Sequence, residues 1–411
     1  MFENQCFILF FISLLLSQDN FVRKPIKNIN ARALLSFIPD DKFIDIVEDT
    51  NIDFQVKKLY GRSMFYLLLY GLLESSKTSL RSLEDIFNSS KFKVIFNIDK
   101  NVKTRYNSIS DRLSTMNVDF FREVFELLYK EFSKSFNEDE ALSYNITRVD
   151  SSMVAEVANK IEKGMVVGVK KENGLKQIKY TVSLTNLLPS SVEVYTEQAY
   201  LSEDIAIPEA ILKHIDKRKD NVFVFDRGVQ SRKAFNELDN EQINFVTRLN
   251  SPVRKEVLET YILPDNVIIN NLTILSDEKI LLFDRKNKKS NPVRLIVTED
   301  EKGETLLFLT NMFDKQIEEI IHIYKKRWGI EVFFRFIKQE LNFKHFMSTS
   351  INGIKIILYM TLILSMLILL YKKYNKVGYK TAKRRFYFEM EELYMAIIIK
   401  MSGGDPALVF R

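Results

Sequence analysis

The chain has 411 residues, which is room for about two or three domains. Hydrophobic residues make up 46% of it and charged residues 28%, which argues against wholesale disorder, a collagen-like chain and a multi-span membrane protein. The single cysteine, Cys6, excludes an internal disulfide framework and a thiolate-rich zinc cluster. Three histidines are too few and too scattered for a metal site built from histidine. Any metal chemistry must therefore rest on carboxylates.

The net charge of +6 is unevenly distributed. Residues 54–112 contain eleven basic and five acidic side chains, and a second basic run lies between Tyr371 and Phe388 without any acid. Two separated basic surfaces are typical of a protein that binds a polyanion such as nucleic acid. A solvated charged face is the alternative interpretation of either run.

Two apolar runs bear on targeting. Residues 6–16 are long enough for a signal-peptide core, but Glu3 stands where a positive charge is expected and no small-residue cleavage site follows. We interpret residues 1–26 as an apolar segment that is either a spurious upstream start or a buried first helix. Residues 356–371 are shorter than the about 20 residues that span a bilayer. We expect a buried core helix there, with a membrane anchor as the alternative.

Residues 27–140 have the pattern of a helical domain. Between Lys57 and about Lys134, Ser and Asn clusters separate four runs with helical periodicity. Paired short helices rich in Lys and Arg resemble a helix-turn-helix DNA reader, although any small helical domain can have this pattern.

From about Tyr144 the pattern changes to alternating and β-branched runs, which predict three neighbouring strands. A helix at about residues 202–214 and an apolar strand at 221–226 follow. Asp150 lies on the first strand and Asp226 ends the fourth, where a side chain reaches the rim of the sheet. This order of elements is that of the ribonuclease H-like fold. Taken singly, each aspartate is better explained as a turn residue.

Residues 243–311 are again rich in strands, and helices return from residue 315 to about 341. At about 100° per residue, one helical face within an arc of roughly 60° carries four polar side chains. They are Tyr324, Arg327, Glu331 and Lys338, with Arg335 beside them. An ordinary salt-bridge ladder between Glu331 and its basic neighbours is the simpler interpretation of this helix alone. Trp328, which is rotated off this face, is expected to pack beneath the strand-rich segment.

The pattern Y-x2-R-x3-E-x6-K, preceded by Asp150 and by the Asp-Arg-Gly at Asp226, resembles the DDE transposases of the bacterial insertion-sequence group four. The resemblance extends from about Lys57 to Tyr371. It also includes the runs VDSSMV and KYTVSL, residues 202–204, residues 308–311 and the LNFKHF that follows the signature.

The resemblance implies a fold and a set of domains. The fold is α/β, with a ribonuclease H-like catalytic core, a mixed sheet flanked by helices, interrupted by a β-rich insertion. An N-terminal helical DNA-binding domain precedes the core. In order, the expected domains are residues 27–140 for DNA binding, 141–242 for the first part of the core, 243–311 for the insertion, 312–375 for the second part with the signature helix, and 376–411 for a basic tail.

The resemblance also implies the roles of individual residues. Asp150, Asp226 and Glu331 are expected to bind two divalent cations, Mg²⁺ with Mn²⁺ able to substitute, because hard cations prefer carboxylate oxygen. Contacts with DNA phosphates are expected from basic and phenolic side chains, namely Tyr324, Arg327, Lys338, Arg335 and Arg227.

The function expected from this resemblance is that of an insertion-sequence transposase. It would bind the terminal inverted repeats of its element and catalyse metal-dependent DNA cleavage and strand transfer in cut-and-paste transposition. Its partners would be double-stranded DNA, both repeat and target, and a second copy in a synaptic homodimer, without a membrane, in the bacterial cytoplasm at the nucleoid. A ribonuclease H-like nuclease that does not join strands and a non-catalytic DNA-end-binding regulator are the alternatives.

Overall fold

The computed structural model of the chain describes residues 30–35, 40–74, 78–96, 98–134, 136, 144–157, 160–167, 174–214, 221–264, 267–341 and 343–409. The prediction for residues 1–26 lies outside the described residues. The chain divides into two compact units. Unit 1 holds the described residues of Met1–Phe136, Glu156–Lys163 and Arg335–Arg411, and unit 2 those of Asn137–Ala155 and Gly164–Phe334.

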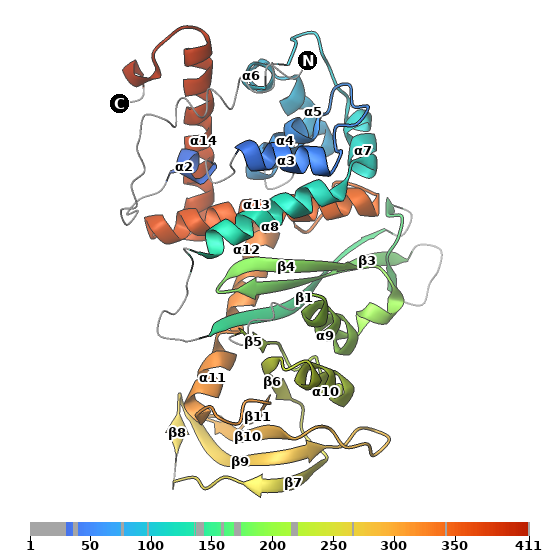
Figure 1. Cartoon of the computed structure of the whole chain (residues 1–411), viewed down its shortest axis with the longest axis vertical. Coiled ribbons are helices and arrows are strands. Elements are labelled where there is room, and N and C mark those ends of the chain that lie inside the picture. Colours follow the sequence, from blue (N-terminus) through green and yellow to red (C-terminus); the bar gives the residue numbers. More distant parts are fainter. Residues whose placement is uncertain are drawn as a thin grey trace. The chain divides into compact units, whose positions relative to one another are not determined.

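Unit 1 is helical and is organised around α13 (Ile351–Asn375) (Figure 1). Helices that contact α13 are α2 (Ala31–Leu35), α4 (Gly61–Glu74), α7 (Tyr106–Thr115), α8 (Val118–Ser133) and α14 (Tyr379–Met401). The unit also contains α3 (Asp40–Asp49), α5 (Leu80–Asn88), α6 (Ser90–Ile95) and the short 3-10 helix η3 (Pro406–Leu408). The four helices expected between Lys57 and about Lys134 are thus present as α4, α5, α7 and α8.

Helix α13 contains the apolar run 356–371. It is the one helix of the described segments that is long and apolar enough to cross a membrane, with a mean hydropathy of 2.3, but 83% of that window is buried inside the structure. The Ser350 hydroxyl caps its first turn by accepting the Gly353 N–H, and Lys376 ends it in a left-handed conformation with φ of 51°. A helix that is apolar on all sides belongs in a core. The prediction of a buried core helix is confirmed.

The segment expected to be a basic tail, residues 376–411, contains helix α14. An apolar stripe that includes Phe386, Met390 and Ile397 is buried, which ties this helix into unit 1. Lys383 from the basic run is also buried, and its ammonium donates to the backbone carbonyl of Glu340. This run is therefore only partly a solvated surface.

Unit 2 is built on one mixed sheet whose strands run in the order β2-β3-β1-β5-β6-β11-β10-β9-β7, with β4 paired to β3 and β8 to β9. Strands β1 and β5, and β5 and β6, are parallel, whereas β6 is antiparallel to β11. The bounds are β1 (Asn145–Val157), β2 (Met165–Val167), β3 (Leu175–Thr185), β4 (Leu188–Tyr195), β5 (Asn221–Val224), β6 (Asn244–Leu249), β7 (Lys255–Thr260), β8 (Ile268–Ile269), β9 (Leu272–Leu282), β10 (Val293–Asp300) and β11 (Thr305–Thr310).

The two faces of this sheet are covered by different helices. On β5, Phe223 points to the core shared with α9 (Glu203–Lys213) and α10 (Arg232–Asn240), while Val222 and Val224 point to the core shared with α11 (Ile317–Lys325). This alternation is the period of two that a strand imposes on its side chains. A short 3-10 helix, η2 (Gln198–Leu201), precedes α9.

The strands expected in residues 243–311 are present, and they continue the same sheet. Strand β6, at the start of this segment, pairs in parallel with β5, and Val246 lies opposite Val224. Strands β11, β10, β9 and β7 then extend the sheet by antiparallel pairing.

Candidate active site

The two aspartates meet because of the register of the parallel strands. On β1 and β5, Arg148 lies opposite Val224, and two residues further along each chain stand Asp150 and Asp226. The Asp226 carboxylate accepts the Gly228 N–H at 2.7 Å, which shapes the turn after β5, and its backbone carbonyl accepts the Thr247 hydroxyl at 3.0 Å. Asp226 thus lies just after the end of β5, and Asp150 lies within β1, two residues beyond the last residue of β1 that pairs with β5.

The helix expected over residues 315–341 is divided in two. Helix α11 ends at Lys325 and α12 (Trp328–Glu340) begins at Trp328, so Tyr324 and Glu331 are on different helices. The buried Arg148 donates from Nε to the backbone carbonyl of Lys326 in the intervening turn. This contact joins the turn to β1, the strand that carries the first aspartate.

The turn leaves the predicted ion pair intact. The Arg327 guanidinium donates to the Glu331 carboxylate at 2.5 Å, as the spacing of four residues predicts. Tyr324 packs edge-on against Phe308 at 5.3 Å, and its ring has the Arg327 guanidinium 5.9 Å from its centroid. Arg327 therefore connects the phenol to the third carboxylate.

The carboxylates influence each other. Burial raises the pKa of Asp150 to about 6. The hydrogen bond from the Ser151 N–H lowers this pKa, and the charge of Asp226 raises it further. The smaller effects of Arg327, which lowers it, and of Glu331, which raises it, oppose each other. An acid held near other acids at low exposure is a site that a cation or a proton would stabilise.

The oxygen donors of this site suit a divalent metal ion. Carboxylate oxygens at adjacent strand ends are the ligands that Mg²⁺ prefers. As the side chains stand, no group of three His, Cys, Asp or Glu residues in the described ranges forms a ready metal cage. Glu331 is held by Arg327 instead, so it would have to leave that partner to join the aspartates.

The remaining predicted residues are spread more widely. Arg227 follows Asp226 directly and is exposed, as is Arg335 on α12. Lys338 is half-buried on α12, and both α12 residues belong to unit 1. The expectation for Trp328 is wrong, because this side chain is 54% exposed at the start of α12 instead of packed.

A fourth acid lies beside the aspartates, in the segment 202–204 to which the sequence analysis assigned no role. Glu203 begins α9, and burial together with the charges of Asp226 and Asp150 raises its pKa to about 7. The fully buried Lys179 on β3 is near it, and its Nζ donates to the Leu201 carbonyl at 2.8 Å. The sequence signal was weak, because acids in a first helical turn are common for their interaction with the helix dipole.

A second missed residue is Arg248 on β6. Its guanidinium carbon is 6.0 Å from the centre of the Tyr324 ring. In the sequence it is one basic residue in an alternating strand, a pattern with no functional meaning by itself.

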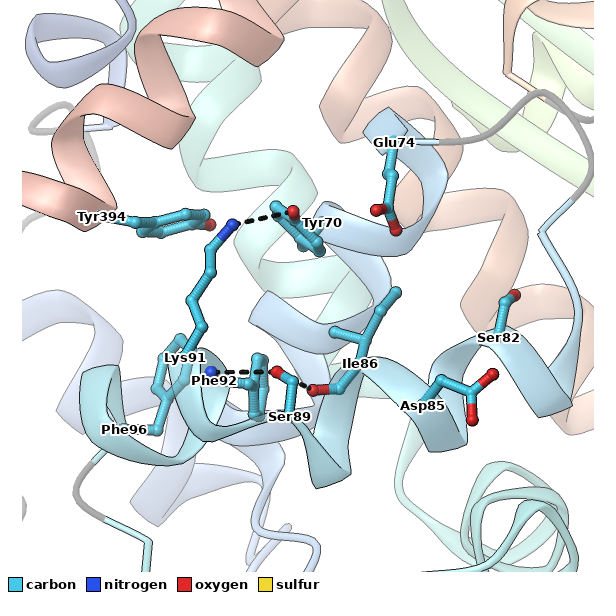
Figure 2. A pocket seen from close by; sticks show the side chains of 10 residues that line it. All are labelled: Tyr70, Glu74, Ser82, Asp85, Ile86, Ser89, Lys91, Phe92, Phe96 and Tyr394. Carbon is cyan, nitrogen blue, oxygen red and sulfur yellow. Dashed lines mark hydrogen bonds between the residues drawn. The ribbon is translucent and has the colours of Figure 1, made fainter.

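Figure 2 shows a pocket of about 420 Å³ in unit 1. Lys91 extends between Tyr70 and Tyr394, with its Nζ 4.7 and 5.1 Å from the two ring centres, and it forms an ion pair with Glu391. None of the predicted site residues lines this pocket.

Comparison with known proteins places the chain in a family. Residues 147–367, more than half of the chain, match the family model described as the transposase DDE domain. The chain therefore belongs to this transposase family. The matched segment contains Asp150, Asp226 and Glu331.

Individual relatives are distant. The chain is 25% identical to a protein of Sinorhizobium fredii named as a transposase, over 38% of this chain and 44% of that one. It is 36% identical to an insertion-sequence transposase of Geobacillus stearothermophilus over 15% of this chain and 16% of that one. With an insertion-sequence transposase of Synechocystis it shares 25% identity over 72% of this chain and 78% of that one. The chain thus spans less than half the length of the first two relatives.

Among solved structures, the piggyBac transposase in its synaptic complex with hairpin DNA is similar, with a TM-score of 0.48 and 11% identity. The match covers 90% of this chain and 82% of that one.

Proposed function

We propose that this protein is an insertion-sequence transposase that cuts DNA at the inverted repeats of its element and joins the ends to a target. The observation that carries the proposal is the parallel pairing of β1 with β5, which brings Asp150 beside Asp226. Glu331, the third acid, lies on α12. Family membership supports the same chemistry, because the matched segment includes all three acids.

The proposed catalytic core is ribonuclease H-like. Support comes from the strand order β4-β3-β1-β5-β6, in which two antiparallel hairpin strands lie on one side of β1 and two parallel strands on the other. We propose that the strands after β6 are an insertion in this core. Unit 1, with its basic N-terminal helices, would recognise the element ends.

We assign Asp150, Asp226 and Glu331 to the binding of two divalent ions, Mg²⁺ or Mn²⁺. Such ions supply, when bound, an activated oxygen nucleophile and charge stabilisation at the leaving oxygen of the phosphate. The chain's own contribution is to orient the carboxylates. Arg148 holds the α11–α12 turn against β1, and the Gly228 N–H fixes the Asp226 carboxylate.

The basic residues have a separate task. When Glu331 turns towards the aspartates, the Arg327 guanidinium is released to bind a DNA phosphate through its planar fork. Tyr324, Arg227, Arg335 and Lys338 are proposed as further phosphate contacts. The assembly would be a homodimer on two DNA ends, acting in the bacterial cytoplasm.

The test uses purified protein, Mg²⁺, a labelled duplex that carries the repeat flanking the gene, and a target plasmid. We expect nicks at the repeat end and joined products, both absent for Asp226→Glu, because the longer side chain misplaces the carboxylate. Asp226→Glu should still bind the duplex. Nicks without joined products would favour the nuclease alternative, and binding without nicks from the unmodified protein would favour the regulator.

A further inference from the structure

Arg248 lies in the same row of the sheet as the two aspartates. On the parallel strands β5 and β6, Val224 lies opposite Val246, and two residues further along stand Asp226 and Arg248. Arg148 of β1 lies opposite Val224 on the other side, so the row that lies two residues beyond the paired positions consists of Asp150 on β1, Asp226 in the turn after β5 and Arg248 on β6. Arg248 points to the same face of β6 as Val246, and the charges of Arg248 and Asp226 both act on the phenol of Tyr324, which packs on that face.

The same face carries the turn between α11 and α12. Two arginines lie near the Tyr324 ring. The guanidinium carbon of Arg248, on β6, is 6.0 Å from the ring centroid, and that of Arg327, in the turn, is 5.9 Å from it. The two arginines are thus held on one ring beside the acids.

The two arginines differ in what they bind. Arg327 is occupied by Glu331. For Arg248, no carboxylate partner is found among the described residues, and its buried Nε has no hydrogen-bond acceptor there. A buried donor that lacks an acceptor destabilises the fold, because its desolvation is not compensated. Such an arrangement favours an anionic ligand that supplies the acceptor.

A purely structural role explains less. A guanidinium near a tyrosine ring gains only a small stabilisation, and that contact does not require the Nε atom to be buried without an acceptor. The position in the row of aspartates is also unexplained by ring packing.

We propose that Arg248 binds the non-bridging oxygens of the DNA phosphate that is cleaved at this site. The inference rests on the proposed function and adds a residue to it. The planar guanidinium can donate two parallel hydrogen bonds to a phosphate. Its charge then stabilises the negative charge on those oxygens while the leaving oxygen is displaced at phosphorus, and Arg327, whose guanidinium also lies near the Tyr324 ring, acts on the same group.

The test compares Arg248→Gln and Arg248→Lys with a matched control, Arg254→Gln. Arg254 lies six residues away, in the segment between β6 and β7, and is exposed, and its guanidinium donates to the Asn287 side chain. Single-turnover nicking is measured at saturating repeat DNA with Mg²⁺. We expect Arg248→Gln to nick about 100-fold more slowly or worse, which is the usual effect of losing one donor to a developing oxyanion. Arg248→Lys should be intermediate, because it keeps the charge and loses the fork.

A second readout is independent of cleavage. Duplex binding is measured by fluorescence anisotropy across a salt series in EDTA. Loss of one phosphate contact should lower the slope of log K against log salt by about 0.9 in Arg248→Gln, and Arg254→Gln should keep the slope of the unmodified protein. Melting temperatures of the variants verify the fold, and Arg248→Lys serves if Arg248→Gln does not fold.

The outcomes separate the two proposals. If the unmodified protein nicks DNA and Arg248→Gln nicks as fast as Arg254→Gln, the role of Arg248 is refuted and the transposase proposal stands. If the unmodified protein does not nick, the transposase proposal fails. The salt slope then still decides whether Arg248 binds phosphate, and an unchanged slope rejects it.

Discussion

Gly329 is the position where a single methyl group tests how the site is held together. A Cβ built on this residue lies 2.8 Å from Cδ2 of Leu187 and 3.0 Å from Nε of Arg148. Ordinary contacts between heavy atoms are at about 3.5–4.0 Å, so Gly329→Ala must displace the neighbours or the turn by roughly 0.5–1 Å. Arg148 is also the residue that donates to the Lys326 carbonyl, which means that the displacement reaches the turn carrying Arg327.

We expect two measurable effects of Gly329→Ala. Overpacking at a buried contact should destabilise unit 2 by about 1–3 kcal/mol, measured by chemical denaturation. A misplacement of this size should slow Mg²⁺-dependent nicking by roughly 10- to 100-fold. Gly378→Ala is the matched control, because nothing lies within 4 Å of its Cβ position. Wild-type stability and nicking in Gly329→Ala would refute the idea that Arg148 and the turn position the site.

Three further predictions concern charge. The pKa of Asp150 in the folded protein is raised to about 6. The folded state therefore keeps a proton that the unfolded chain releases near pH 4. The stability of the metal-free protein should consequently fall as the pH rises from about 4 to 7. Asp150→Asn should flatten this fall in a series of melting curves, and an equal slope would contradict the assignment. Arg294 forms an ion pair with Asp277 at 2.7 Å, and both side chains are buried. Arg294→Met should lower the free energy of unfolding of unit 2, measured in urea, by about 3–5 kcal/mol. A decrease below about 1 kcal/mol would be inconsistent with an unpaired buried carboxylate. In unit 1, Glu391→Ala leaves the half-buried Lys91 without its carboxylate partner and should lower the free energy of unfolding by about 1–3 kcal/mol. Glu392, on the same helix, is exposed, and no hydrogen bond or ion pair of its side chain is found among the described residues. Glu392→Ala should therefore lower the free energy of unfolding by less than about 0.5 kcal/mol.

The sequence predicted the strands and the two aspartates well because the signals are local. An apolar run that ends in an acid indicates a buried strand with its carboxylate at the rim, and the structure has Asp226 in that position. Helix α13 was equally clear, since sixteen of its residues are buried and almost all of the run is apolar. No knowledge of distant partners was needed for either.

The missed features depend on contacts between distant parts of the chain. The spacing of Tyr324, Arg327 and Glu331 fits one continuous helix, but the turn between α11 and α12 is bonded to Arg148, which is 178 residues away from Lys326. Arg248 gains its meaning only from the register of β6 against β5. Pairing of this kind is not encoded in the local pattern of either strand.

Other differences come from patterns that allow two outcomes. The acid-free basic run suggested a tail, but the buried stripe that follows it on α14 includes Met390, Tyr394 and Ile397. Trp328 was expected to be packed because it is rotated off the polar face of the helix, yet it begins α12 at the surface. Glu203 was hidden among the acids that commonly start a helix.

The central claim is that Glu331 completes the carboxylate set begun by the two aspartates. The most direct measurement is nicking of a duplex carrying the flanking repeat, with and without Mg²⁺, by the unmodified protein, by Glu331→Gln and by Glu318→Gln, which changes an exposed acid on α11. The account predicts Mg²⁺-dependent nicks at the repeat end from the unmodified protein and from Glu318→Gln, and none from Glu331→Gln, with equal binding of the duplex by all three. Nicking by Glu331→Gln at the rate of Glu318→Gln would contradict it.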